Sequence, residues 1–356
     1  MIGLLIALLA GPAPATVALL PLENLSGDER AAGDVGAVLA RALTAGGYTV
    51  VRGEAVEAVL EAERVRYLDS LPEGVRRKLA GELGAGAVLS GTVYTYAEGT
   101  SAMLAFSARM VGLDGAVRWT AVVGITARDT EGLLGTGRAA TLDALLREAS
   151  ARVQRDLPAP DEPAPERRRG KPFHLEGPRA FAAAALGEVD TRRVAVLPPG
   201  SFAADARAAA VLSHLLAIRL RDAGLDVVEP ADLRAAMRAE GIRSFRGLDA
   251  GPLRQVGARV GATLFVNGSV YAWRDSSAVA GGWPEVSLEL SLVDAARARV
   301  LWTAQHARKG EDYAFLFQRG AVTSAIALAD RVVGEMLDAL PAPTARRGRV
   351  NASREP

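Results

Sequence analysis

The segment GAGAVLSGTVY at residues 84–94 recurs 177 positions later as GATLFVNGSVY at residues 261–271. The correspondence extends back to Val17 and Val194 without a gap, and 26 of its 78 aligned positions are identical. The identical positions are mostly apolar residues and glycines, which a fold needs for its core and turns. A catalytic set would instead persist as reactive polar side chains. The chain therefore holds two copies of one domain, and the repeat predicts architecture more than chemistry.

Each copy opens with a strand, a helix and a second strand. In the first copy, Val17–Leu20 is a short apolar run typical of a buried strand, and Ala31–Ala45 has apolar residues at helical spacing. Tyr48–Val51 predicts the second strand, and two more helices are expected near residues 54–65 and 73–83. This order favours a right-handed parallel crossover.

After Gly84 the apolar period changes from that of a helix to that of a strand. Three strands are expected near residues 87–94, 101–111 and 118–126, forming an antiparallel meander, and a closing helix carries an apolar stripe from Leu134 to Val153. The second copy repeats these elements near residues 194–197, 207–223, 225–228, 230–240, 249–260, 263–273, 285–293 and 299–306, with a closing stripe from Phe317 to Leu337. The predicted class is α/β: two tandem mixed-sheet domains, each β-α-β-α-α followed by a meander and a closing helix.

Composition shifts divide the chain into five segments. We expect a signal peptide at 1–15, the first domain at 16–157, a proline-rich linker at 158–190, the second domain at 191–340 and a flexible basic tail at 341–356. Within the linker, Phe181–Leu186 predicts one helical turn.

The amino terminus indicates export. Ile2–Ala10 is apolar, an A-x-A pattern follows it, and cleavage between Ala15 and Thr16 is predicted, which places the mature chain in the periplasm. The alternative is a buried amino-terminal strand. No basic residue precedes the apolar run, which leaves the start codon open, and no later segment is long enough for a transmembrane helix in the mature chain.

Composition excludes several kinds of chemistry. The chain has no cysteine, which rules out disulfides, thiol nucleophiles, thiolate metal sites and a lipid-modified amino-terminal cysteine. Its 42 basic residues are interspersed with 41 acidic ones, so no nucleic-acid partner is expected. The three histidines lack a zinc-binding spacing, and no G-x-S-x-G or phosphate-loop motif occurs. We predict no catalytic residue, no metal site and no cofactor.

One feature unique to the second copy suggests a binding role. Its first hairpin is longer, and the added residues lie between Trp273 and Trp283. Aromatic side chains on a loop are frequent anchors in protein interfaces, so both tryptophans are predicted partner contacts; packing of the loop onto its own sheet is the alternative.

Three motifs together suggest a family. VALLPLENLSGD at residues 17–28, GAGAVLSGTVY at 84–94 and VRWTA at 117–121 resemble the TolB amino-terminal-like domain, an architecture shared with the curli-secretion channel lipoprotein and with lipoprotein activators of penicillin-binding proteins. The resemblance covers both copies, the second more loosely. It implies a non-enzymatic module of the cell envelope that binds other proteins or self-assembles, associated with the outer membrane in many relatives.

We therefore expect a periplasmic adaptor that binds envelope or outer-membrane proteins, with self-association left open. The first alternative is a self-assembling component of an outer-membrane secretion or assembly system similar to the curli channel. The second alternative is a sensor of a small ligand, a nucleotide or a sugar, that uses the loops after the first strands.

Overall fold

The computed structural model describes residues 15–99, 102–130, 141–160, 176–184, 186, 193–242, 250–276, 282–315 and 319–341. It confirms the predicted class, because the chain is α/β with two mixed sheets. The first sheet has the strand order β3-β1-β4-β5-β6, with the short β2 beside β4. The second has the order β10-β8-β11-β12-β13-β7, with the short β9 beside β11.

The first sheet is built from the first half of the chain. Its elements are β1 (Thr16–Leu19), β2 (Glu23–Asn24), α1 (Ala31–Ala45), β3 (Thr49–Val51), α2 (Glu54–Ala62), α3 (Glu73–Leu83), β4 (Ala87–Ala97), β5 (Met103–Gly112), β6 (Val117–Thr126), a 3₁₀ turn η1 (Ala127–Thr130) and α4 (Leu142–Asp156). β1 pairs in parallel with β3 and β4, and β4, β5 and β6 form the predicted antiparallel meander.

The second sheet repeats this plan with one additional strand. Its elements are β7 (Arg179–Ala182), β8 (Arg193–Val196), β9 (Gly200–Ser201), α5 (Ala208–Asp222), β10 (Asp226–Val227), α6 (Pro230–Ala239), α7 (Ala250–Val260), β11 (Leu264–Arg274), β12 (Glu285–Asp294), β13 (Val300–Lys309), a 3₁₀ turn η4 (Gly310–Tyr313) and α8 (Ala325–Asp338). Gly84 and Gly261 follow α3 and α7 with φ of 66° and 70°, a left-handed conformation that explains why glycine is kept at both positions.

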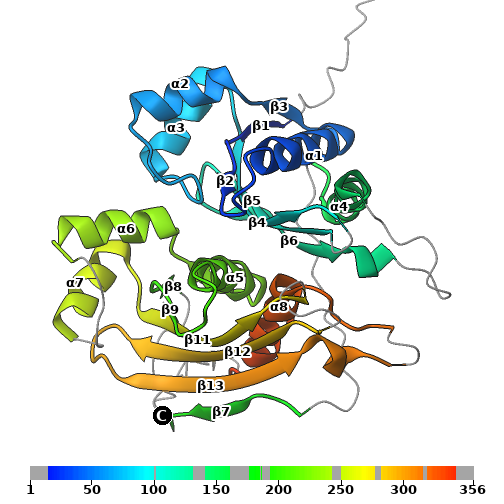
Figure 1. Ribbon diagram of the computed structural model, residues 1–356. Coiled ribbons are helices and arrows are strands. Elements are labelled where there is room, and N and C mark those ends of the chain that lie inside the picture. Colours follow the sequence, from blue (N-terminus) through cyan, green and yellow to red (C-terminus); the bar gives the residue numbers. More distant parts are fainter. Residues whose placement is uncertain are drawn as a thin grey trace, which may run out of the picture.

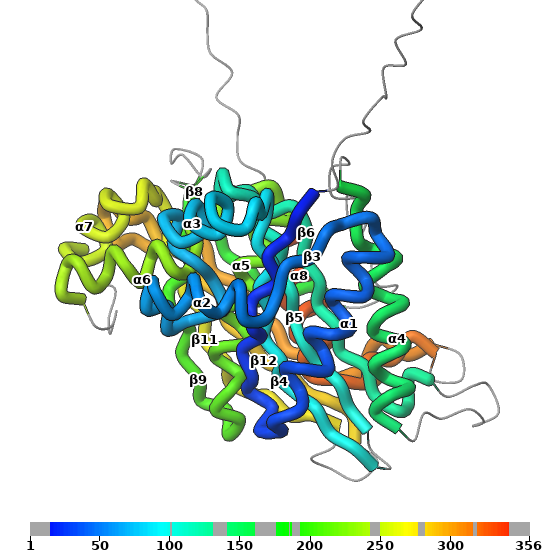
Figure 2. Tube along the Cα trace, turned by 90° about the horizontal axis from the view of Figure 1, so that it is seen from above, coloured from blue at the N-terminus to red at the C-terminus, as the bar shows by residue number. Residues whose placement is uncertain are grey.

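The two halves stack so that helices and sheets alternate. α1 and α4 cover one face of the first sheet, and α5 and α8 lie between the two sheets (Figure 1). Seen from above, α1 and α4 run side by side over β4, β5 and β6 (Figure 2). α2 with α3, and α6 with α7, form smaller cores against the β1 and β8 ends of their sheets. α5 and α8 of the second copy therefore pack against both sheets.

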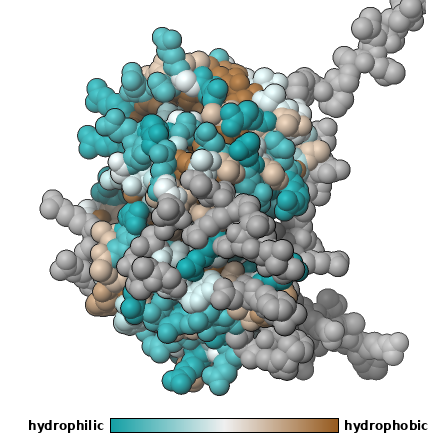
Figure 3. Space-filling model, turned by 45° about the vertical axis from the view of Figure 1, so that its right-hand side comes forward, coloured by the Kyte–Doolittle hydropathy of each residue, from teal (hydrophilic) through white to brown (hydrophobic). Residues whose placement is uncertain are grey.

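Burial along the central strands records this stacking. Every residue of β5 is buried, so the first sheet is covered on both faces. In β12 burial alternates, and Glu285, Ser287, Glu289 and Ser291 remain partly exposed. The second sheet thus keeps the part of this face that α6 and α7 do not cover open to solvent, and the coloured part of the molecular surface in Figure 3 is mainly hydrophilic.

The structure differs from the sequence expectations at three places. Arg179–Ala182, within the expected linker, forms β7 on the edge of β13, so the helical turn predicted from Phe181 is wrong at its start. Glu23–Asn24 and Gly200–Ser201, where no strand is predicted, each pair briefly with the long strand of their sheet. Leu134 and Phe317, which begin the predicted closing stripes, lie outside the described residues.

Candidate functional site

Polar side chains gather where the first sheet meets α5, and they are the first candidate for a site. Tyr94 of β4 lies with its hydroxyl 2.7 Å from Ser107 Oγ and 2.7 Å from His214 Nδ1 of α5. Arg207, just before α5, donates to the Tyr94 carbonyl at 2.7 Å. Burial raises the pKa of Tyr94, which keeps the phenol protonated as a hydrogen-bonding group.

Asp69, in the loop between α2 and α3, is the centre of one ion network. Arg234 of α6 donates to both of its carboxylate oxygens, at 2.8 and 3.0 Å, and also lies over the Tyr67 ring at 4.7 Å. His214 Nε2 is 3.8 Å from the same carboxylate. Burial raises the pKa of Asp69, but the nearby His214 and the hydrogen-bonded Arg234 lower it overall. This pairing joins the two halves by opposite charges.

Glu229, immediately before α6, is the centre of a second network. It accepts from Ser70 Oγ at 2.9 Å and from Arg221 at 2.6 Å, and Arg109 of β5 lies 3.1 Å from it. Burial would raise the pKa of Glu229, yet the charges of Arg109 and Arg221 lower it overall. Desolvation also lowers the pKa of Arg221 to about 10. The carboxylate is thus ionised and fully partnered.

These networks join the two copies and leave little room for a substrate. The cavities beside them have volumes of about 20 and 10 Å³, which is space for one water molecule at most. Their side chains are occupied by one another across the boundary between the copies. We interpret the cluster as the contact that fixes the two copies in one orientation.

In the sequence this contact is marked by positions at which the two copies differ, but their meaning is clear only once the structure is known. His214 corresponds to Ala37 in the first copy, and Glu229 corresponds to Arg52. Polar residues whose counterparts in the other copy are apolar or of opposite charge serve neither the shared fold nor a shared site. They mark the surface on which two otherwise similar domains differ, here the boundary between them.

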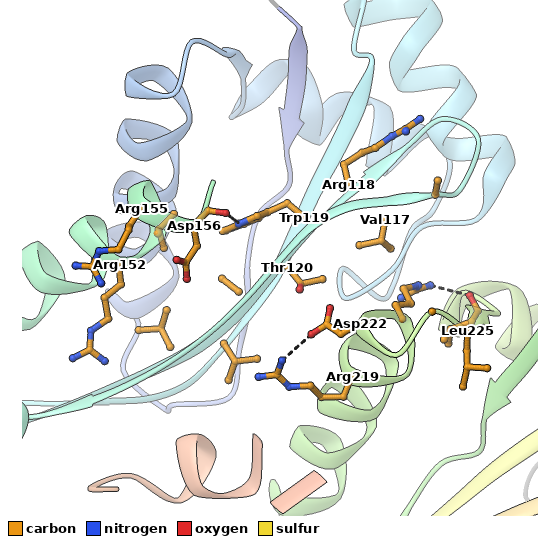
Figure 4. A pocket seen from close by; sticks show the side chains of 18 of the residues that line it. Val117, Arg118, Trp119, Thr120, Arg152, Arg155, Asp156, Arg219, Asp222 and Leu225 are labelled. Atoms are coloured by element: carbon orange, nitrogen blue, oxygen red, sulfur yellow. Dashed lines mark hydrogen bonds and ion pairs between the residues drawn. The ribbon is translucent and has the colours of Figure 1, made fainter. Parts of the chain in front are cut away.

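A larger hollow lies at the other side of the same boundary. It is a cleft of about 1160 Å³ whose floor is β6 and the turn before it, whose upper wall is the end of α4, and whose lower wall is the end of α5 with the loop into β10. Figure 4 shows Trp119 and Thr120 between Arg152, Arg155 and Asp156 on one side and Arg219, Asp222 and Leu225 on the other. The lining residues are 115–123, Glu148, Arg152, Val153, Arg155, Asp156, Arg219, Arg221, Asp222 and 224–227.

The floor of this cleft is the free edge of a sheet. β6 is the last strand of the first sheet, and in the part of the chain that the structure describes no strand pairs with its outer side. The equivalent strand of the second copy, β13, is capped by β7, which opposes Ala182 to Trp302 and Arg179 to Gln305. Trp119 of β6 is the counterpart of Trp302. Among the described residues, the last meander strand of the second copy is therefore covered by a further strand, whereas that of the first copy borders the cleft.

The charges in the cleft are mostly paired. Arg219 forms ion pairs with Asp330 and, at 2.7 Å, with Asp222, and Arg152 pairs with Glu148 at 2.9 Å. Arg155 is exposed on the upper wall and has no ion pair with any residue described. Trp119 donates through Nε1 to the Asp156 carbonyl at 2.9 Å, which fixes its ring on the α4 side of the strand. The cleft thus offers the outer backbone groups of β6 and the exposed Arg155, whereas the Trp119 ring is only 3% exposed and belongs to the core of the first copy.

The two tryptophans predicted as partner contacts lie differently from each other. Trp273 is only 8% exposed and belongs to the main core of the second copy, contrary to the surface position expected for it. Trp283 is partly buried, and Arg128 of the first copy lies 5.2 Å from its ring centre. Trp283 thus contacts the other copy, and its role toward a partner stays a prediction.

The predicted cleavage point coincides with the start of the first strand. Thr16 is the first residue of β1, and its carbonyl accepts from Gly86 at 2.8 Å. The Ala15 carbonyl accepts from Thr49 at 3.2 Å, and residues 1–14 lie outside the described part. Cleavage after Ala15 would therefore leave β1 whole.

Two further searches concern metals and membranes. Among the described residues, no group of three or more histidine and carboxylate side chains is placed to hold a metal ion. No helix in the same ranges is both long enough and apolar enough to cross a bilayer.

Comparison with known proteins gives likeness in fold only over parts of the chain. No protein-family model and no curated protein matches the sequence. Solved structures with similar arrangements include lipoprotein GNA1162 from Neisseria meningitidis, at 25% identity over 39% of this chain and 95% of that one, with a TM-score of 0.30. The PelC L103M dodecamer from Paraburkholderia phytofirmans has 19% identity over 45% and 98%, with a TM-score of 0.30. The LpoB C-terminal domain from Salmonella enterica has 13% identity over 34% and 84%, with a TM-score of 0.28. Likenesses at these TM-scores carry no conclusion about function.

Proposed function

We propose that this chain is an exported, non-enzymatic adaptor of the cell envelope that binds other proteins. The observation that carries the proposal is the outer edge of β6, with which no described strand pairs, at the floor of an open cleft. A sheet edge with free backbone groups is a common means of binding an extended peptide, and monomeric proteins normally cover such edges. The second copy covers its own edge with β7, which makes the open edge of the first copy a feature to explain.

The joint between the copies supports an adaptor rather than two loosely tethered modules. Buried ion networks around Asp69 and Glu229 hold the second copy's helices against the first sheet. A binding cleft whose two walls come from different copies would thereby keep a constant shape. Export is supported by the apolar run Ile2–Ala10 and the A-x-A pattern after it, and by the resemblance of both copies to TolB amino-terminal-like domains.

The experiment that tests this proposal is affinity purification from cross-linked envelope fractions, using a carboxyl-terminal tag. Mass spectrometry would identify both the retained proteins and the first residue of the tagged chain. We expect a distinct envelope protein in amounts comparable to the bait, and a bait that begins at Thr16. Retention of the bait in cytosolic fractions with Met1 intact would overturn the export proposal, and recovery of the bait alone would overturn the adaptor proposal.

A second candidate function is self-assembly, which one specific observation favours. On the open face of the second sheet, Tyr271 stacks on Phe202 with ring centres 5.4 Å apart, and both rings are exposed. The same position in the first copy, Tyr94, is covered by α5. Sedimentation of the purified chain decides between the two candidates: a large homogeneous assembly favours self-assembly, and a monomer favours the adaptor.

A further inference from the structure

The capped edge of β13 shows which backbone groups an added strand on β6 would meet. The Ala183 N–H donates to the Leu301 carbonyl at 2.8 Å. Since pairing alternates along antiparallel strands, Thr303 and Gln305 also direct their backbone groups toward β7. Their counterparts in β6 include Arg118, for Leu301, and Val122, for Gln305. These two residues lie along the floor of the cleft.

We propose that an extended segment of a partner protein adds to β6 as an antiparallel strand, in the register that β7 takes on β13. This inference rests on the proposed protein-binding function and specifies how the partner is held. Backbone hydrogen bonds from Arg118 and Val122 supply affinity that does not depend on sequence, and the two walls select the side chains of the added strand.

The shape of the cleft favours a single strand over the edge of another sheet. The end of α4 borders β6 on one face and the end of α5 with the loop into β10 borders it on the other. A second folded sheet would bring its own covering helices against these walls. A single extended segment needs only the space that one strand occupies beside its neighbour, about 4.8 Å.

The two walls differ in chemistry, and side chains of the added strand would alternate between them. On the α4 side the wall presents Arg152, which is paired with Glu148, the exposed Asp156, and Arg155, which has no ion pair with any described residue. On the α5 side, Val122 and Leu225 both pack at the margin of the second copy's core and are partly exposed. The complementary segment therefore carries acidic side chains alternating with apolar ones.

A defined peptide tests this assignment on the full chain. The probe is a short fluorescein-labelled peptide of alternating glutamate and valine, and its binding is measured by fluorescence anisotropy. The matched peptides replace glutamate with lysine or place proline at the centre. We expect saturable binding of the acidic peptide, roughly tenfold weaker binding of the lysine peptide, and none of the proline peptide.

Variants of the chain locate the binding site. Val122→Pro removes an N–H that points away from β5, a position where an edge strand tolerates proline. It should abolish binding, whereas Val122→Ala keeps the N–H and should retain it. Arg155→Glu should weaken binding of the acidic peptide and improve binding of the lysine peptide. Circular dichroism and melting temperature establish that each variant is folded.

Hydrogen exchange supplies a readout that is independent of affinity. Bound peptide should slow exchange of the amides in residues 117–123 and leave β13 unchanged. Equal binding by Val122→Pro, protection confined to another surface, or no saturable binding of the acidic peptide would each overturn the inference.

The proposed function can fail independently of the strand addition. If the tagged chain captures a partner equally well with Val122→Pro, the adaptor role is supported and the strand addition is wrong. If the peptide binds as expected but envelope fractions yield no partner, the strand addition is supported and the adaptor role is wrong.

Discussion

Tyr94 and Tyr271 occupy the same position in the two copies, yet one is buried and the other is exposed. Tyr94 is 2% exposed and lies against His214 of α5, whereas Tyr271 is 49% exposed and stacks on Phe202. The shared tyrosine marks the same face of the sheet in both copies. What differs is the neighbour: α5 of the second copy covers Tyr94 on the first sheet, whereas α6 and α7 cover the corresponding face of the second sheet only around Phe265 and Val293 and leave Tyr271 exposed.

This difference predicts unequal costs for the same substitution. Tyr94→Ala should lower the free energy of unfolding by about 3–5 kcal/mol, because it opens a cavity and removes a partner of Ser107 and His214. Tyr271→Ala should cost about 1 kcal/mol or less, because it removes only an exposed ring stack and an exposed hydrogen bond to Glu289. Urea unfolding monitored by circular dichroism measures both, and equal costs would contradict the assigned interface.

Gly124 of β6 provides a test of how closely α8 approaches the first sheet. A Cβ at this position would lie 2.3 Å from Ser324 Oγ and 2.6 Å from Ile326 Cγ2. Gly124→Ala should therefore lower the free energy of unfolding by about 1–3 kcal/mol through overpacking between the copies. Gly36→Ala in α1 is the matched control, since nothing lies within 4 Å of its Cβ. That variant should be neutral or more stable by up to about 1 kcal/mol. The prediction fails if both changes have the same sign.

The buried carboxylates predict that acid weakens the joint between the copies. The folded-state pKa of Glu229 lies below its ordinary value of 4.5, and that of Asp69 lies below 3.8. A depressed carboxylate pKa adds stability that is complete above the ordinary value and is lost as the pH falls through the folded-state value. The free energy of unfolding should thus fall as the pH drops below about 4.5.

Glu229→Gln separates this effect from general acid unfolding. At pH 7 the variant should lose about 3–5 kcal/mol, because Arg109 and Arg221 stay buried without their counter-ion. The difference from wild type should shrink as the pH falls through the lowered folded-state pKa of Glu229, because the wild-type carboxylate is then protonated as well. Glu61→Gln, on the exposed side of α2, is the control and should run parallel to wild type. A difference that is constant with pH would show that Glu229 is not ionised in the folded state.

Trp283 is the residue with which to test the hairpin of the second copy. Trp283→Ala removes the contact with Arg128 and should lower the free energy of unfolding by about 1 kcal/mol, so the chain stays folded. Trp273→Ala removes a core ring and should cost about 3–5 kcal/mol, which makes it unsuitable for a binding test. If Trp283 contacts a partner, capture from envelope fractions should weaken; unchanged capture would rule that role out.

The sequence predicts the repeated elements because both copies carry the same periodic patterns. Apolar runs such as Val17–Leu20 and helical spacing such as Ala31–Ala45 depend on local burial, and the structure places β1 and α1 there. β7 escapes this reasoning because all four of its residues are exposed. Its strand exists through backbone pairing with β13, and no side-chain pattern records that pairing.

The joint between the copies is unpredictable for a related reason. His214 is a single histidine within a helix, Asp69 lies in a polar loop, and neither belongs to a motif that would single it out in the sequence. The two residues belong to different copies, and they come within 3.8 Å of each other only because the copies stack. The cleft beside β6 depends on the same stacking, since its two walls come from different halves of the chain.

Phe181 and Ala180 allow a test of why the second copy caps its edge. Phe181 opposes Thr303, and alternation from the Ala183 hydrogen bond directs its N–H toward β13, while the N–H of Ala180 points away. Phe181→Pro should therefore release β7, whereas Ala180→Pro should leave it in place. Since the Phe181 side chain is exposed, the first change removes backbone pairing and no core packing.

Released β13 would present an open edge without the helical walls that border β6, and such edges promote association. We expect faster amide exchange in residues 302–305 and concentration-dependent oligomers in sedimentation velocity for Phe181→Pro alone. Oligomers from both variants would point to a general effect of proline in this segment, and a monomeric Phe181→Pro with fast exchange would show that β7 does not serve to protect the edge.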